Sequence, residues 1–174
     1  MQQDNQLARI QALYHALNGV PNGVAELRGS ETDPQLHGTA LFYQTRGGAL
    51  VTVYAAGLPT AGNACERPIF ALHIHSGTAC TGDETDPFMD ARSHYNPEGC
   101  AHPFHAGDLT PLFGNQGTAF SVLLTDRFSV EEVYGKTLIL HRNPDDFTTQ
   151  PSGNAGTKMA CGIIRPTRRR SCRG

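Results

Sequence analysis

The sequence predicts an all-β domain preceded by one short helix. Three observations lead to this fold class: seven short runs rich in Val, Leu, Thr and Tyr, a single stretch with helical periodicity, and 19 glycines with 11 prolines among 174 residues. β-branched and aromatic residues favour strands, while glycine and proline mark the turns between them. We expect the β domain at residues 21–164, the helical segment at 1–20 and a basic tail at 165–174.

The helix is expected over residues 5–18, where apolar side chains recur every three or four positions, at Leu7, Ile10, Leu13, Tyr14 and Leu17. Asp4 or Asn5 is suited to cap its start, and Asn18-Gly19 supplies a stop. The apolar face needs a cover, and two alternatives stay open. Either the helix is an oligomerisation arm in a homodimer, or it packs on its own domain.

Seven strands are expected after the helix, at residues 24–28, 36–46, 49–56, 69–75, 117–126, 136–142 and 158–164. Gly47-Gly48 separates two of these runs and predicts a hairpin turn. Residues 76–116 show little alternation and are rich in Gly, Pro, Asp, Asn and Thr. A loop of this length inside one domain is usually functional.

Charge and hydropathy exclude several classes of partner. The net charge is −2, but the last ten residues hold five arginines, so the remaining chain carries nine basic and sixteen acidic residues. An acidic body predicts no nucleic-acid partner, and we expect the tail to be solvated and disordered. The longest apolar stretch, residues 49–58, is too short to span a membrane. The N-terminus as written lacks a secretory signal, which favours the cytoplasm, with export as the alternative if the chain was trimmed.

Two imidazoles are expected side by side in the run His73-Ile74-His75. Residues two apart on a strand point to the same face, so these side chains form a pair suited to a metal. On its own, such a pair would more often be two exposed histidines. Here the long loop adds His94, His102, His105 and Asp108.

The loop residues supply three nitrogens and one oxygen, a set that suits tetrahedral zinc. His141 ends the buried run Thr137–Leu140, where a core histidine is the alternative interpretation. An imidazole has two nitrogens, so one loop histidine could serve two metals. The six histidines would then divide into a four-nitrogen site typical of copper(II) and a zinc site.

This pattern resembles the Cu,Zn superoxide dismutase family. The matching segments are ALHIHSGTAC (71–80), SHYNP (93–97), HPFHAGDL (102–109), TLILHRNPDD (137–146) and GNAGTKMACG (153–162). They follow the family's order, and the resemblance covers residues 24 to 164. It implies an eight-stranded Greek-key β-barrel or sandwich with long metal-binding loops.

The resemblance also implies roles for individual residues. His73, His75, His94 and His141 correspond to copper ligands, and His94, His102, His105 and Asp108 to zinc ligands, so His94 bridges the two metals. Asp145 corresponds to the carboxylate that links a copper ligand to a zinc ligand. Cys80 and Cys161 match the family's disulfide, and the spacing from His75 to Cys80 resembles the bacterial branch. Cys65 and Cys100 could form a second bridge, which leaves Cys172 over.

The implied activity is a copper(II)/copper(I) cycle that converts superoxide into dioxygen and hydrogen peroxide, with zinc as a structural tuner. His94 corresponds to the proton-delivering residue. A substrate this small is captured by electrostatic attraction, for which the family has an arginine three residues before the second disulfide cysteine. This chain has Lys158 there, and a lysine does not reproduce the planar fork of an arginine.

A second departure lies between Asp146 and Gly153, where residues 147–152 carry no charge. In the family, a longer loop with charged residues shapes the electric field over copper. Arg142, beside His141, is a candidate to supply part of that field. We therefore expect a working dismutase that is slower, and less sensitive to ionic strength, than is usual in the family. The alternative is a non-enzymatic copper-binding or copper-delivering relative with low turnover.

Overall fold

The computed structural model describes residues 2–167. One helix, α1 (Gln2–Leu17), precedes the strands, and three short 3-10 helices lie in the connections: η1 (Ala64–Glu66), η2 (Met89–Ala91) and η3 (Val130–Val133). The strands are β1 (Gly23–Gly29), β2 (His37–Thr45), β3 (Gly48–Ala56), β4 (Ile69–Phe70), β5 (Leu72–His75), β6 (Leu112–Phe113), β7 (Thr118–Thr125), β8 (Thr137–His141), β9 (Lys158–Ile163) and β10 (Arg165–Pro166).

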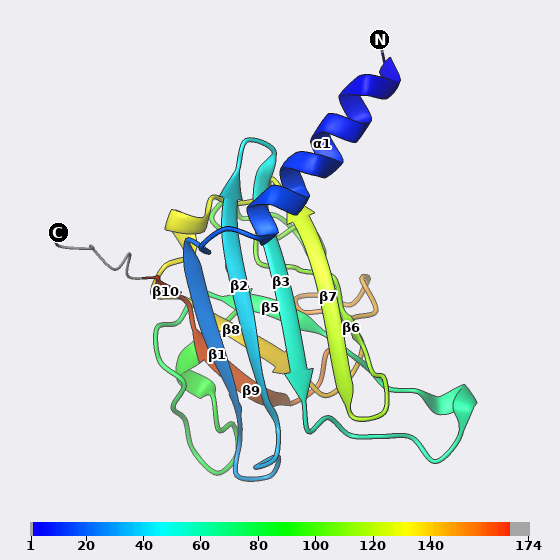
Figure 1. Cartoon of the computed structure of the whole chain (residues 1–174). Helices are drawn as coiled ribbons and strands as arrows, with labels where there is room; N and C mark the ends of the chain where they lie inside the picture. The colour runs from blue at the N-terminus through cyan, green and yellow to red at the C-terminus, as the bar shows by residue number, and fades with distance from the viewer. Residues whose placement is uncertain (1, 168–174) are drawn as a thin grey trace, which may run out of the picture.

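The strands form a curled antiparallel sheet in the order β5-β8-β9-β1-β2-β3-β7, with β10 added beside β1 (Figure 1). A second ribbon pairs β4 with β6. Only Ala71 separates β4 from β5, and β6 contacts β7, so the ribbon links the two edge strands of the main sheet. This is the all-β Greek-key barrel that the resemblance implied.

Alternating side chains of the sheet fill the barrel. The buried cluster includes Phe42 of β2, Ile74 of β5, Leu138 of β8 and Met159 of β9, all fully buried. Each of these strands therefore has one face fixed by the core. For β5, burial of Leu72 and Ile74 turns the two histidines of the strand to the opposite face.

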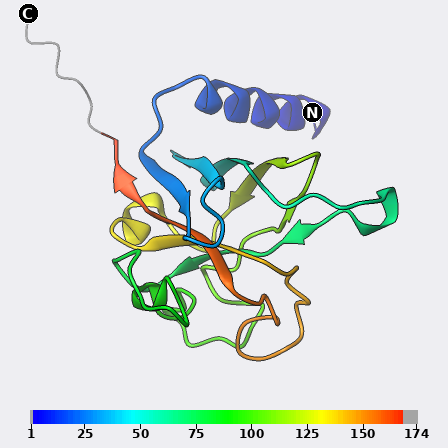
Figure 2. The same ribbon diagram turned by 90° about the horizontal axis from the view of Figure 1, so that it is seen from below.

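Helix α1 lies outside the barrel at one end of the sheet, where it contacts β2, and its N-terminal part projects beyond the strands (Figure 1 and Figure 2). Leu13, Ala16 and Leu17 are half-buried, whereas Ile10 and Tyr14 stay exposed. Four of the five apolar positions expected to share one covered face are thus divided between the barrel side and solvent, while the side chain of Leu7 lies outside the described part of the chain. No helix among the described residues is long and apolar enough to cross a membrane.

The strand predictions need three corrections. The run expected at 69–75 is interrupted at Ala71, because β4 pairs with β6 while β5 pairs with β8. The two-residue strand β6 lies inside the expected loop, where two residues give no periodicity. The expected tail begins with strand β10, which pairs with Gly23 and Val24 of β1. The rest of the tail from residue 168, including Cys172, lies outside the described residues.

Candidate metal centre

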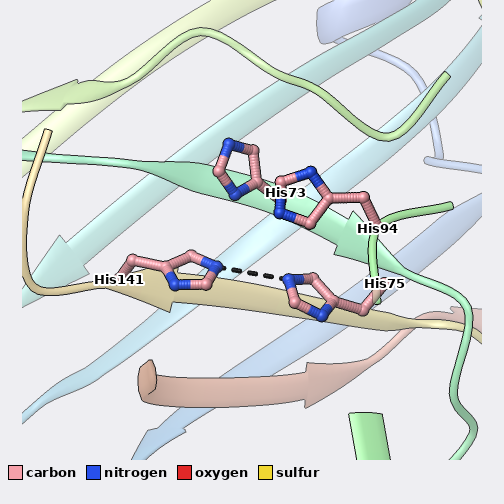
Figure 3. A group of neighbouring side chains, drawn as sticks. All are labelled: His73, His75, His94 and His141. Atoms are coloured by element: carbon pink, nitrogen blue, oxygen red, sulfur yellow. Dashed lines mark hydrogen bonds between the residues drawn. The ribbon is translucent and has the colours of Figure 1, made fainter. Parts of the chain in front are cut away.

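Four histidines from three segments converge beside the sheet. His73 and His75 project from β5, His141 ends β8, and His94 comes from the long loop (Figure 3). Strands β5 and β8 are hydrogen-bonded neighbours, and the register shifts between Leu140 and His141. One nitrogen from each ring lies within 4.8 Å of the others, and all four side chains are buried. We call this group the four-histidine cluster.

The hydrogen bonds of the four rings show which nitrogens are free to bind a metal. His73 donates from Nε2 to Asp145 (2.8 Å), and His75 donates from Nδ1 to the Arg92 carbonyl (2.7 Å). His141 directs Nδ1 to the Gly156 carbonyl (3.3 Å), because a carbonyl oxygen can only accept. The lone pairs left over are at Nδ1 of His73 and at Nε2 of His75 and His141.

His94 also belongs to a second group, with His102, His105 and Asp108, which we call the carboxylate cluster. Its Nδ1 lies 2.7 Å from Asp108 Oδ1 and 3.3 Å from His105 Nδ1, while its Nε2 is buried without a hydrogen-bond partner. His102 Nδ1 lies 3.0 Å from Asp108 Oδ2 without hydrogen-bond geometry. The imidazole of His94 therefore presents one nitrogen to each cluster.

Asp145 joins the two clusters through a second path. Its carboxylate accepts hydrogen bonds from Nε2 of His73 (2.8 Å) and from Nε2 of His102 (2.9 Å). Burial by itself would raise the pKa of Asp145, but these bonds and the Phe147 N–H hold that pKa well below its usual value. Gly153 passes close over this bridge with φ +65, and a Cβ there would overlap the Asp145 carboxylate. The glycine thus leaves room for the bridge.

The close approach of ring nitrogens fits metal ions. Nε2 of His75 and Nε2 of His141 lie 3.2 Å apart, and each ring already donates from Nδ1, so two lone pairs face one another. Burial, helped by the neighbouring histidines, lowers the pKa of His75 well below 6.5 and that of His141 to about 3. Both rings are therefore neutral near pH 7, and neutral imidazole is the form that binds metals, so a metal cation between the two nitrogens would relieve this repulsion.

A pocket of about 370 Å³ leads to the four-histidine cluster. It is lined by His75, His94, His141, Pro151, Lys158 and Arg92, among others. The expected position of Lys158 at the pocket is thus observed, but its Nζ also lies 2.5 Å from Asp86 Oδ2 and donates to the Phe88 carbonyl (3.1 Å). The lysine charge is therefore partly neutralised by a carboxylate.

Arg142 does not serve the pocket, contrary to our expectation. Its guanidinium binds both carboxylate oxygens of Asp33, at 2.5 and 2.7 Å, and it does not line the pocket. Successive strand residues point to opposite faces, so the position after His141 turns away from the cluster. The sequence neighbour of a ligand candidate was therefore the wrong residue to choose.

Cysteine pairing follows the resemblance in one case. Cys80 and Cys161 form a disulfide, which ties the segment after β5 to β9. The suggested bridge between Cys65 and Cys100 is wrong, because both thiols are free and exposed. Cys65 lies in η1 and Cys100 in the long loop, where Asn96 holds its backbone N–H and carbonyl.

Three residues that support the centre were missed by the sequence analysis, because none of them belongs to a recognisable sequence motif. Arg127 donates from Nη1 to the carbonyls of Pro103, His105 and Asp108, at 3.1 to 3.3 Å. Gln150 holds both the N–H and the carbonyl of His102. Arg92, the third, lies only two positions before His94, and that proximity was the one available signal.

Comparisons with known proteins agree with this geometry. The profile of the copper/zinc superoxide dismutase family (SODC) matches residues 36–164. The chain is 30% identical over 149 residues to superoxide dismutase [Cu-Zn] 2 of Aquifex aeolicus, which covers 77% of this chain and 82% of that protein. It is 33% identical over 157 residues to superoxide dismutase [Cu-Zn] of Schizosaccharomyces pombe, covering 81% of this chain and 95% of that protein.

Proposed function

Because the chain belongs to the copper/zinc superoxide dismutase family, whose cofactors are copper and zinc, we propose that it disproportionates superoxide. Two superoxide anions and two protons give one dioxygen and one hydrogen peroxide. The observation that carries this proposal is the two-sided imidazole of His94, with one nitrogen in each cluster. Hydrogen bonds hold the rings of His73, His75, His102 and His141 so that each leaves a lone pair for its cluster.

We assign copper to the four-histidine cluster and zinc to the carboxylate cluster. The copper donors would be Nδ1 of His73 and Nε2 of His75, His94 and His141, an all-nitrogen set that suits copper(II). The zinc donors would be Nδ1 of His94, His102 and His105 with the Asp108 carboxylate, a complete tetrahedral set. Copper, when bound, accepts one electron from one superoxide and returns it to the next.

His94 is the proposed proton carrier. Its Nε2 is buried, has no hydrogen-bond partner and faces the pocket, whereas its Nδ1 is held at Asp108. When Nε2 is not bound to copper, it can hold a proton taken from water and release it to the reduced anion. The second proton comes from water in the open pocket.

Asp145 orients the rings on both sides of this proton carrier. It fixes the protons of His73 and His102 at Nε2, so that Nδ1 of each ring stays free. Carboxylates that accept a hydrogen bond from a metal-binding histidine fix the tautomer and the orientation of its ring in this way. The arrangement therefore sets orientation before any substrate enters.

Lys158 is the proposed anion-binding residue in this reaction. It lines the pocket, but its bond to Asp86 reduces the charge that an approaching anion meets. We therefore expect slower capture than a free arginine would give. In Lys158→Ala, kcat/KM for superoxide should fall; an unchanged value would make the residue a surface cation only.

The test of the function is superoxide decay by stopped flow, with copper and zinc quantified for each preparation. A rate that is proportional to copper per chain and persists in excess EDTA, which removes free copper, supports the dismutase. Full copper occupancy without such decay would overturn it and favour the copper-handling alternative. Two observations favour this alternative, because both reduce the positive charge available to attract superoxide: the Lys158–Asp86 pair and the uncharged segment 147–152.

The homodimer remains a separate proposal. Its support is the exposure of Ile10 and Tyr14 on α1, at 63% and 65% of each residue's maximum. Sedimentation velocity of the whole chain, and of the chain lacking residues 1–20, tests it. A monomer that keeps its stability after the deletion excludes the oligomerisation arm.

A further inference from the structure

Arg92 brings a second positive charge to the pocket. It lines the same pocket as His75, His94 and His141, and its side chain is exposed. Within residues 2–167 no carboxylate lies within ion-pair distance of its guanidinium, and the described pocket lining contains no Asp or Glu. Lys158, the other cation of the lining, is bound to Asp86. The uncompensated charge at this pocket is therefore the arginine.

The backbone of Arg92 has a separate task. Its carbonyl accepts the hydrogen bond from Nδ1 of His75 at 2.7 Å, and its N–H donates to the Met89 carbonyl. The residue has φ 63 and ψ −146, a conformation that glycine adopts readily and other residues rarely do. A glycine would make both backbone contacts without strain, so the backbone task gives no reason for a long cationic side chain.

We propose that Arg92 guides the superoxide anion to the four-histidine cluster. It would supply the positive charge that Lys158, standing where the family has an arginine, provides only in part because it is paired with Asp86. This inference rests on the proposed function. Arg92 acts by its charge at the pocket, while its carbonyl fixes the ring of His75. It is a positioning residue for the anion, and no proton or electron passes through it.

The expected size of the effect follows from one unit charge near a protein surface. At an effective dielectric constant of about 35 and a separation of about 10 Å between guanidinium and anion, removing that charge weakens the binding of a monovalent anion by about fivefold at low salt. At about 1 M salt the Debye length is only about 3 Å, so the difference should largely disappear. A purely structural role of Arg92 would not depend on salt in this way.

Azide is the probe, because it is a monovalent anion that binds copper(II) and does not turn over. Its dissociation constant is measured by visible absorption on the full chain loaded with copper and zinc, at low and at high salt. Arg92→Gln and Arg92→Gly both remove the charge. Glycine adopts the backbone conformation of this position without strain, so Arg92→Gly still tests the inference if Arg92→Gln folds poorly. Arg92→Lys keeps the charge, and Arg67→Gln removes an exposed arginine from a different pocket.

We expect azide binding to weaken about fivefold in both charge-removing variants at low salt, with the copper spectrum unchanged. Arg92→Lys and Arg67→Gln should stay near the wild type. Equal azide affinity in wild type and Arg92→Gly would overturn the inference while leaving the dismutase proposal intact. So would a loss in Arg92→Gly that persists at high salt, because that loss would come from the ring of His75. A wild-type chain that takes up no copper(II) overturns both.

Discussion

The disulfide between Cys80 and Cys161 should contribute a large share of the stability of the metal-free protein. The two cysteines are 81 residues apart in sequence, so the bond closes a long loop in the unfolded chain. The chain-entropy relation gives about 4.5 kcal/mol for a loop of this length. Cys161 is also buried against Phe88, Ala91 and Ile139, and losing that packing should cost about 1 kcal/mol more.

The perturbation is the double variant Cys80→Ser, Cys161→Ala, compared with the wild type in urea after removal of metals. The chain has no tryptophan, so unfolding is followed by far-UV circular dichroism. We expect the free energy of unfolding to fall by about 4 to 6 kcal/mol. If the variant is already unfolded without urea, the wild-type curve must give a free energy of unfolding of no more than about 6 kcal/mol.

Cys65→Ser is the matched control, because Cys65 is free and exposed. It should change the free energy of unfolding by less than about 0.5 kcal/mol. A loss below about 1 kcal/mol in the double variant would refute the entropic argument, since even modest native disulfides contribute more. An equal loss in the control would show that cysteine replacement, and not the broken bond, was measured.

Three further outcomes are expected. Asp145→Asn should weaken zinc binding about 10-fold to 100-fold in competition with a chelator, because an uncharged amide has only one acceptor oxygen and cannot accept from both His73 and His102. Arg127→Gln should weaken zinc binding, with little effect on copper binding, because its three carbonyl contacts all lie in the segment that carries the zinc donors. Hydrogen bonds from Thr149 and Thr148 lower the pKa of Asp146 from 3.8 to about 2, so the ionised form is the one that the fold favours. The stability from Asp146 is therefore complete above about pH 5 and lost as the pH falls towards 2, and Asp146→Asn should flatten that part of an acid-unfolding curve.

Much of the fold could be predicted because the long strands alternate regularly. The strands expected at 24–28, 49–56 and 117–126 match β1, β3 and β7 within a residue at either end. Alternation fails for β6 and β10, which contain two residues each and exist because a partner strand lies beside them. Their formation depends on tertiary pairing that no local pattern encodes.

The candidate site likewise contains residues that local spacing predicted and residues that only tertiary contacts bring in. Spacing within one strand placed His73 and His75 together, and short spacing within one loop grouped His102, His105 and Asp108. Contacts between distant segments gave no such signal. Arg142 turned to Asp33 in the β1–β2 connection, and Arg127 reached back to the carbonyl oxygens of the loop. A long side chain has many reachable partners, and only the assembled fold selects one.

The shared residues of the two clusters have a thermodynamic consequence. His94 belongs to both clusters, and Asp145 holds one ring in each, so filling either site restrains groups that the other site needs. Ordering those groups once lowers the cost for the second metal, which is positive cooperativity. Linkage is reciprocal, so zinc must raise the affinity for copper by the same factor by which copper raises the affinity for zinc. Loading of the pair should accordingly be steeper than that of two independent sites, with few chains holding a single metal.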